Sequence, residues 1–186
     1  MNTLKKIWNL LTTGLVAAVV LLAVLLVGVR IFGFTPFVVL SGSMEPTYHT
    51  GSLIYVKKVD PFALEAGQVI TYMVNEDTVV THRMVGIVPD EEDPSVIRFR
   101  TKGDANDVED GTLVHYKNVI GTPVFTIPYL GYLSDYLTNP PGMYIGIMVL
   151  GIVILLMFAP DILRAADKAD KKAAAEKQAE EVDATE

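Results

Sequence analysis

The sequence of 186 residues contains no cysteine. A disulfide framework, a thiolate nucleophile and any Cys-ligated zinc or iron–sulfur site are therefore excluded, which leaves His, Asp, Glu, Ser and Lys for chemistry. Basic residues are also in short supply, because 15 Lys and Arg stand against 22 Asp and Glu and the net charge is -7. Such a chain has no basic surface to neutralise phosphates, which argues against a nucleic-acid partner.

Charge is absent from two long segments of the chain. Hydrophobic residues make up 51% of the sequence and the mean hydropathy is +0.37. The segments 7–29 and 140–159 contain no charged residue, and about 20 apolar residues are enough to cross the ~30 Å hydrocarbon layer. We therefore predict two transmembrane helices. A cleavable signal peptide is the alternative for the first segment, but its apolar core would be unusually long and no small-x-small site follows it.

Basic residues lie at the chain-terminal end of each apolar segment. Lys5 and Lys6 precede the first segment, and Arg164, Lys168, Lys171 and Lys172 follow the second. By the positive-inside rule both termini are cytoplasmic, and the region between the segments is extracytoplasmic. The predicted organisation of this multi-pass protein of the cell membrane is a stub and first helix (1–34), an outer domain (35–139), a second helix (140–159) and a charged tail (160–186). The tail is either a solvated helix or disordered.

The outer domain has the pattern of a β structure. Short runs rich in Val, Ile, Thr, Tyr and Phe, bounded by turn residues, predict strands at 37–40, 52–58, 67–74, 79–88 and 96–102. Helical periodicity is absent from 35–139. In the last of these runs Ile97, Phe99 and Thr101 alternate with cationic residues, which predicts one buried and one solvated face. An acidic turn is expected at 89–94.

Four aromatic residues precede the second apolar segment: Phe125, Tyr129, Tyr132 and Tyr136. Aromatic residues are enriched where a protein meets the bilayer interface. They are also common in ordinary cores, and the sequence leaves both interpretations open.

A serine and a histidine are the candidates for chemistry. Ser41-Gly42-Ser43 follows an apolar run, and a serine on a Gly-containing turn can project its hydroxyl group, although a plain polar turn has the same pattern. Of the three histidines, His82 shares a strand face with Val80 and Met84, so we expect it to be partly desolvated. Burial disfavours imidazolium and keeps the ring in the neutral form that a general base needs. A hydrogen-bonded core histidine is the alternative.

An acidic loop follows the strand at 96–102. Its carboxylates belong to Asp104, Asp107, Glu109 and Asp110. The loop lacks the EF-hand pattern, so calcium is not favoured. A carboxylate that accepts a hydrogen bond from a histidine N–H fixes the tautomer and stabilises the imidazolium, which is the third role in a serine triad. Lys102 is an alternative base, but the alternation places it on the solvated cationic face, where it stays protonated.

Four sequence boxes, in this order, resemble the membrane-anchored type I signal peptidases. Within that family they are similar to the endoplasmic-reticulum type, also found in archaea and some Gram-positive bacteria, which has His where most bacterial members have Lys. The boxes are Ser41–Thr47, Gly67–Tyr72, Thr81–Gly86 and Lys102–Asp110. The resemblance implies a mainly β fold, with an antiparallel β catalytic domain on the membrane surface flanked by two transmembrane α-helices.

The resemblance also implies roles for individual residues. Ser43 would be the nucleophile, His82 the general base and Asp110 the orienting carboxylate, with Asp104 as its partner or competitor. The Ser43 backbone N–H and the Ser41 hydroxyl group would form the oxyanion hole. An additional aspartate at position 107 is a departure from the family pattern and leaves the choice among the acids open.

The activity implied by the resemblance is removal of signal peptides from exported preproteins by a serine endopeptidase without cofactor or metal. Its partners would be signal peptides, the lipid bilayer and the protein export machinery. A non-enzymatic, membrane-tethered β domain that binds exported proteins or complex subunits is the alternative. A self-cleaving repressor is disfavoured by the two predicted spans.

Overall fold

The computed structural model describes residues 2–90, 93 and 96–183, and it divides into two compact units. Val19–Pro140 form one unit, and the two ends of the chain form the other. Residues 91, 92 and 94 of the predicted acidic turn at 89–94 lie outside the described residues. Three α-helices are described: α1 (Asn2–Leu26), α2 (Leu130–Thr138) and α3 (Gly142–Asp183).

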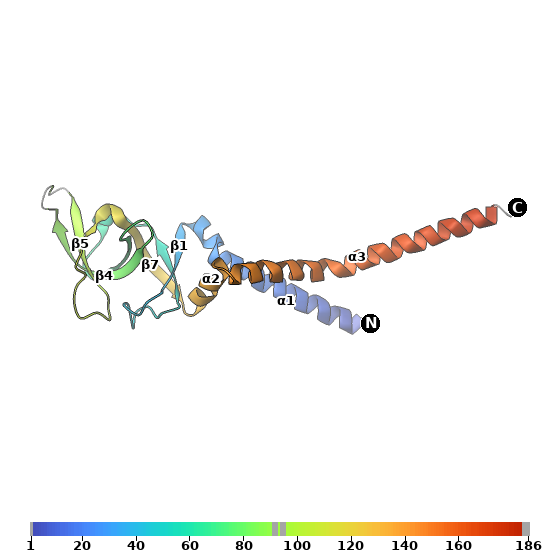
Figure 1. Cartoon of the computed structure of the whole chain (residues 1–186), viewed down its shortest axis with the longest axis horizontal. Helices are drawn as coiled ribbons and strands as arrows, with labels where there is room; N and C mark the ends of the chain where they lie inside the picture. Colours follow the sequence, from blue (N-terminus) through green and yellow to red (C-terminus); the bar gives the residue numbers. More distant parts are fainter. Residues whose placement is uncertain (1, 91–92, 94–95, 184–186) are drawn as a thin grey trace. The chain divides into compact units, whose positions relative to one another are not determined.

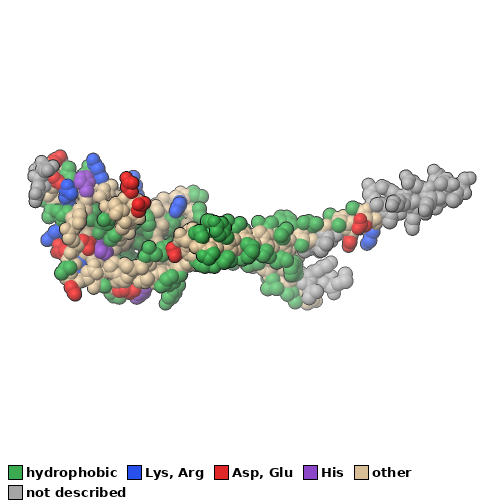
Figure 2. Space-filling model, viewed as in Figure 1, with side chains coloured by type: hydrophobic (Ala, Val, Ile, Leu, Met, Phe, Trp, Pro, Cys, Tyr) green, Lys and Arg blue, Asp and Glu red, His purple; other side chains and the backbone are tan. Residues whose placement is uncertain are grey.

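Two of the helices are long and apolar enough to cross a membrane, by length and composition. They contain the stretches Lys6–Leu26 and Gly142–Ala159, with mean hydropathies of 2.4 and 2.5. In Figure 2 hydrophobic side chains cover the visible surface along the apolar part of α3. The first helix ends earlier than the apolar segment, because Gly28 has a low helix propensity and the chain continues as a 3-10 helix, η1 (Gly28–Phe32). The tail continues α3 as a helix to Asp183.

The remaining elements form one seven-stranded antiparallel sheet, which confirms the predicted mainly β fold class (Figure 1). The strand order is β1-β2-β7-β3-β4-β5-β6. The strands are β1 (Phe34–Val38), β2 (Leu53–Lys57), β3 (Val69–Met73), β4 (Val79–Pro89), β5 (Ile97–Lys102), β6 (Val114–His115) and β7 (Val119–Ile127). Short 3-10 helices, η2 (Pro61–Ala63) and η3 (Tyr116–Asn118), lie in the connections.

The strands β2 to β5 agree with the sequence prediction, whereas β1, β6, β7 and α2 differ from it. The run at 37–40 is only the end of a longer strand, and Leu40 lies exposed beyond it. The strands β6 and β7 are absent from the prediction. In β7 the register shifts between its partners Tyr55 and Val56, and Pro123 is accommodated at this irregularity. Finally, the short helix α2 lies inside the region where helical periodicity is absent.

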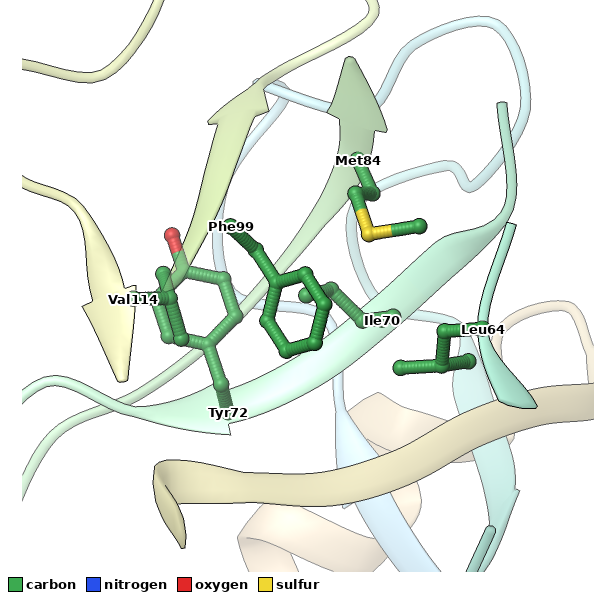
Figure 3. Packing of buried hydrophobic residues seen from close by; sticks show 6 residues of the cluster. All are labelled: Leu64, Ile70, Tyr72, Met84, Phe99 and Val114. Atoms are coloured by element: carbon green, nitrogen blue, oxygen red, sulfur yellow. The ribbon is translucent and has the colours of Figure 1, made fainter. Parts of the chain in front are cut away.

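A buried cluster underlies the strands that carry the candidate residues (Figure 3). It consists of Leu64, Ile70, Tyr72, Met84, Phe99 and Val114. Phe99 and Thr101 are fully buried while Arg100 is exposed, so the alternation predicted for this strand is confirmed. Truncation of a buried Phe to Ala costs about 3–5 kcal/mol of unfolding free energy, so Phe99 is a main contributor to the stability of this part of the sheet.

A second buried cluster joins the end of α1 to the sheet. Val29, Leu53 and Tyr55 form its centre. The Tyr55 hydroxyl group donates a hydrogen bond to the Leu25 carbonyl oxygen at 3.0 Å, and the Phe125 ring stacks on the Tyr55 ring at 4.2 Å between centroids. The last turn of α1 is therefore part of the folded β unit.

The aromatic residues that precede α3 do not lie in the core. Phe125, Tyr129, Tyr132 and Tyr136 are all exposed. The core interpretation of these residues is therefore wrong. The ring of Tyr132 lies so close to Gly51 that a Cβ at that position would be 1.9 Å from the ring. Only glycine fits there, and this contact packs α2 against the start of β2.

Candidate active site

The candidate nucleophile, Ser43, lies in the loop between β1 and β2. Its carbonyl oxygen accepts a hydrogen bond from the Ala105 N–H at 2.9 Å. A Cβ on Gly103 would be 2.6 Å from the same oxygen, so the acidic loop approaches the Ser43 backbone as closely as a glycine allows. Two loops that lie about sixty positions apart in the sequence thus fix the backbone of one serine.

The structure brings Ser43, His82 and Asp110 together. His82 lies on β4 and is 8% exposed, so the predicted partial desolvation of its ring is confirmed. Its Nε2 atom is 3.1 Å from the Ser43 Oγ atom, and its Nδ1 atom is 2.6 Å from Asp110 Oδ2. With the Nδ1 proton donated to the carboxylate, Nε2 is left to accept the hydroxyl proton. A hydroxyl, an imidazole and a carboxylate in this order can perform nucleophilic catalysis.

The carboxylate of Asp110 is held by groups that the sequence analysis did not identify. Its Oδ2 atom accepts hydrogen bonds from the Thr101 hydroxyl at 2.6 Å and the Tyr72 hydroxyl at 3.2 Å. Burial alone would raise the pKa of Asp110, but hydrogen bonds from His82, Thr101 and Tyr72 outweigh it and the pKa is lowered. Burial likewise raises the pKa of Tyr72 to about 12, so this phenol remains a donor. The sequence indicated only that Thr101 lies on the buried face of β5, not that its hydroxyl group binds Asp110.

The other aspartate assigned by the resemblance, Asp104, has different partners. It receives two hydrogen bonds from the Arg83 guanidinium, from Nε at 2.8 Å and from Nη2 at 2.6 Å, and a further one from the Thr47 hydroxyl group. The hydrogen bonds from Arg83 lower the pKa of Asp104 despite its burial. Asp104 therefore ties the loop that carries Ser43 to β4, and among the described contacts its carboxylate makes no hydrogen bond with His82.

Of the other two candidates, Ser41 lies next to Ser43, and Lys102 does not. The Ser41 hydroxyl oxygen is 3.3 Å from the Ser43 Oγ atom, so both hydroxyls face one point. Lys102 Nζ instead donates to the Asp107 carbonyl oxygen at 3.3 Å, on the solvent-exposed side of the loop. This contact gives Lys102 no part in the Ser43 cluster.

Two further histidines were possible bases from the sequence. His49 forms an exposed pair with Glu45, and His115 Nδ1 accepts from the Lys117 backbone N–H at 3.1 Å. Neither contact involves a serine hydroxyl. Among the residues that the structure describes, no group of three or more His, Asp or Glu side chains could hold a metal ion.

A cavity of about 650 Å³ opens beside Ser43 and His82. Its walls are mostly apolar and come from the end of β1 with the loop after it, and from the start of β4; they include Phe37, Val38, Val39, Leu40, Met44, Val79 and Val80. The strand β1 is at an edge of the sheet, and the segment Val79–His82 pairs with β3 while pairing with β5 begins only at Arg83. Within the described residues, both walls therefore present backbone edges without a neighbouring strand.

Comparison with known proteins identifies the chain's relatives. The family described as Signal peptidase, peptidase S26 matches residues 12–129. The chain is 39% identical over 124 residues to Signal peptidase I W of Bacillus subtilis, covering 62% of this chain and 64% of that protein. It is 33% identical over 128 residues to the signal peptidase complex catalytic subunit SEC11C of Rattus norvegicus, covering 64% of this chain and 66% of that protein.

A more distant relative is the signal peptidase complex catalytic subunit SEC11 of Plasmodium falciparum, which is 29% identical over 128 residues. The chain matches just under two thirds of the length of the Bacillus and rat proteins. The matched family region includes Ser43, His82 and Asp110, and the resemblance drawn from the four sequence boxes is confirmed. The chain belongs to the signal peptidase family, peptidase S26.

Proposed function

We propose that this protein is a membrane-bound serine endopeptidase that removes signal peptides from exported preproteins. The observation that carries the proposal is the continuous hydrogen-bonded arrangement of Ser43, His82 and Asp110 at the edge of an apolar cavity. Membership of the signal peptidase family supports the same reaction.

In the proposed reaction the Ser43 Oγ atom attacks the carbonyl carbon of the scissile bond and its proton passes to His82 Nε2. The Asp110 carboxylate holds the ring through Nδ1 and stabilises the imidazolium. When the C–N bond breaks, Nε2 returns the proton to the leaving amine nitrogen and an ester with Ser43 remains. Water then hydrolyses the ester with His82 again acting as the base.

Negative charge on the former carbonyl oxygen needs donors placed in advance. We assign this role to the Ser43 backbone N–H, as the family resemblance implies, and to the Ser41 hydroxyl, whose oxygen is 3.3 Å from the Ser43 Oγ atom. Loss of one such donor typically lowers kcat by about 100- to 1000-fold. The hydrogen bond from the Ala105 N–H to the Ser43 carbonyl oxygen limits movement of the Ser43 backbone, which carries the assigned N–H donor.

The substrate would enter the cavity as an extended segment. Exposed edges of β1 and of the Val79–His82 segment offer backbone hydrogen bonds, and alternate side chains of an added strand point in opposite directions. One set of side chains then faces the apolar wall. Met44, which is buried, belongs to this wall beside Ser43.

We further propose that α1 and α3 cross the membrane. Large apolar side chains are exposed along both helices, including Leu10, Leu21, Ile147 and Leu155, and an apolar surface of this extent is stable in contact with lipid. The basic residues before the first apolar segment and after the second support a cytoplasmic position for both termini and an extracytoplasmic position for the β domain. The exposed rings of Tyr129 and Tyr132 would then lie at the bilayer interface.

Anchoring gives the reaction an advantage that needs no further contact. A signal peptide is itself an apolar helix, so enzyme and substrate share one plane and their effective concentration rises. The proposed partners are therefore signal peptides and the lipid bilayer. The rat relative is named as a subunit of a signal peptidase complex, so export-machinery subunits are proposed as further partners of this chain.

The test is cleavage of a preprotein by the full-length protein purified in detergent, with Ser43→Ala as the matched control. We expect the wild type to release a signal peptide at one site and the variant to release none, because triad members act as a unit. Binding of the preprotein without cleavage would instead support the non-enzymatic tethered domain. Equal cleavage by both proteins would show that a contaminating protease is responsible.

A further inference from the structure

A second cavity, of about 300 Å³, lies next to the proposed catalytic group. It shares His82 and Val80 with the first cavity and also reaches Asp110, but Ser41 and Ser43 line only the first one. None of the proposed catalytic steps takes place in this second cavity. Its position on the histidine side of the nucleophile suggests which part of the substrate it serves.

The direction of proton transfer divides the substrate between the two cavities. The acyl part stays bonded to the Ser43 Oγ atom, so it occupies the cavity that contains Ser41 and Ser43. The leaving nitrogen takes its proton from His82 Nε2, so it must lie within hydrogen-bond distance of that atom. The residues after the cut therefore continue from the imidazole of His82, and the second cavity begins at this residue.

The lining of the second cavity is apolar and exposed. Met73, Val74 and Leu113 are 40%, 53% and 41% exposed, although each is a large hydrophobic side chain. The polar groups at its inner end are already engaged, because the Tyr72 hydroxyl contacts Thr101 and Asp110. Thr112 and Asn118 also line the cavity, but the exposed hydrophobic side chains give it a surface that gains free energy when apolar area is covered. The negative charge of Asp110 further disfavours an acidic ligand.

We propose that this cavity binds the side chain of one of the first two residues after the cut and that it selects an apolar side chain against an acidic one. The inference rests on the proposed function, since it assigns the leaving part of the same substrate. The occupant is the mature protein's first residues, and the continuity of the two cavities through His82 argues for it. A volume of about 300 Å³ is at the lower limit for ligand pockets, which fits one side chain better than a second strand.

The experiment uses the full-length protein in detergent and preproteins that differ only at the first or second position after the cut, where Leu is exchanged for Asp. We expect wild-type kcat/KM to favour Leu by on the order of tenfold at one of these positions. Leu113→Lys should reduce or reverse this ratio, because it replaces apolar contact by a charge that attracts Asp. Ile87→Lys is the matched control, since Ile87 is 44% exposed on β4 and lines neither cavity.

Ratios, rather than rates, separate the selectivity from general damage to the enzyme. If Leu113→Lys does not fold, Met73→Lys replaces it and should change the ratio in the same direction. Equal wild-type rates for Leu and Asp at both positions, or a ratio that both cavity variants leave unchanged, would overturn the inference while cleavage itself still supports the proposed function. A wild-type protein that cuts none of the preproteins would overturn the proposed function, and this inference with it.

Discussion

The substitution Gly103→Ala tests whether the acidic loop holds the nucleophile in place. A Cβ at position 103 would lie 2.6 Å from the Ser43 carbonyl oxygen, where an ordinary contact is at least 3.4 Å, so the two must separate by about 0.8 Å. The Asn106 side-chain amide would be 2.7 Å away and can rotate aside, whereas the Ser43 carbonyl oxygen is backbone and cannot. The strain is therefore expected to move Ser43 relative to His82.

A displacement of this size has a known order of cost. Misplacing a reacting group by about 1 Å can lower a rate by on the order of 100-fold, which corresponds to about 2.7 kcal/mol of activation free energy. Overpacking also lowers the free energy of unfolding, typically by about 1–3 kcal/mol. We therefore expect Gly103→Ala to remain folded at room temperature and to cleave about 100-fold more slowly than the wild type.

The assay is single-turnover cleavage of a preprotein, with chemical denaturation of the same preparations to measure stability. Gly14→Ala in α1 is the matched control, because among the described residues no atom lies within 4 Å of a Cβ there, apart from its own helix. Cleavage by Gly103→Ala at the wild-type rate would refute the reasoning. So would a lost activity fully explained by an unfolded fraction.

Three further predictions concern the hydrogen bonds around Ser43. Ser41→Ala should keep detectable cleavage, reduced about 100- to 1000-fold, and activity as low as that of Ser43→Ala in a single-turnover assay would contradict its oxyanion role. Asp110→Asn should lower kcat on the order of 10⁴-fold with little change in KM, as measured by steady-state kinetics, and an unaltered kcat would remove Asp110 from the mechanism. The pKa of Asp104 is lowered in the folded protein, so its contribution to stability is complete above the ordinary carboxyl value of 3.8 and is lost as the pH falls below it. Asp104→Asn should therefore lower the free energy of unfolding by about 1.5 kcal/mol near neutral pH, because the Arg83 side of the pair is partly exposed. Its stability should fall less steeply than that of the wild type as the pH drops below about 4 in denaturation experiments, and equal slopes for the two proteins would contradict the role of Asp104.

The period-two pattern of the strands explains what the sequence could predict. Alternation along β4 places His82 beside Met84 on the buried face, and alternation along β5 places Phe99 and Thr101 inside. These are local properties of a strand, and they agree with the structure. In contrast, β7 contains Pro123, a residue that lacks the N–H for a strand ladder, and its sheet position depends on an irregularity that no local pattern encodes.

The choice among the aspartates depended on the path of a loop. Successive residues of β4 point to opposite faces, so Arg83 and His82 face different partners. The backbone bond from the Asp110 N–H to the Thr101 carbonyl oxygen, 2.8 Å, returns the chain so that Asp110 reaches His82, while Asp104 meets Arg83. Sequence spacing alone contains no information on this return. The Tyr72 hydroxyl, 38 positions from its carboxylate partner, was missed for the same reason.

The hydrogen bond from Tyr55 to Leu25 determines how the first helix can act on the reaction. The end of this helix is fixed to the β unit, because Leu26 and Val29 pack in the cluster that contains Tyr55 and the Leu25 carbonyl oxygen accepts the Tyr55 hydrogen bond. The distance between the Ser43 hydroxyl and the last turn of α1 is then set within one compact unit, Val19–Pro140. If α1 crosses the membrane as proposed, the protein would select substrates by the distance of the scissile bond from the lipid. A preprotein with suitable side chains around that bond would still not be cleaved if the bond lay at another distance.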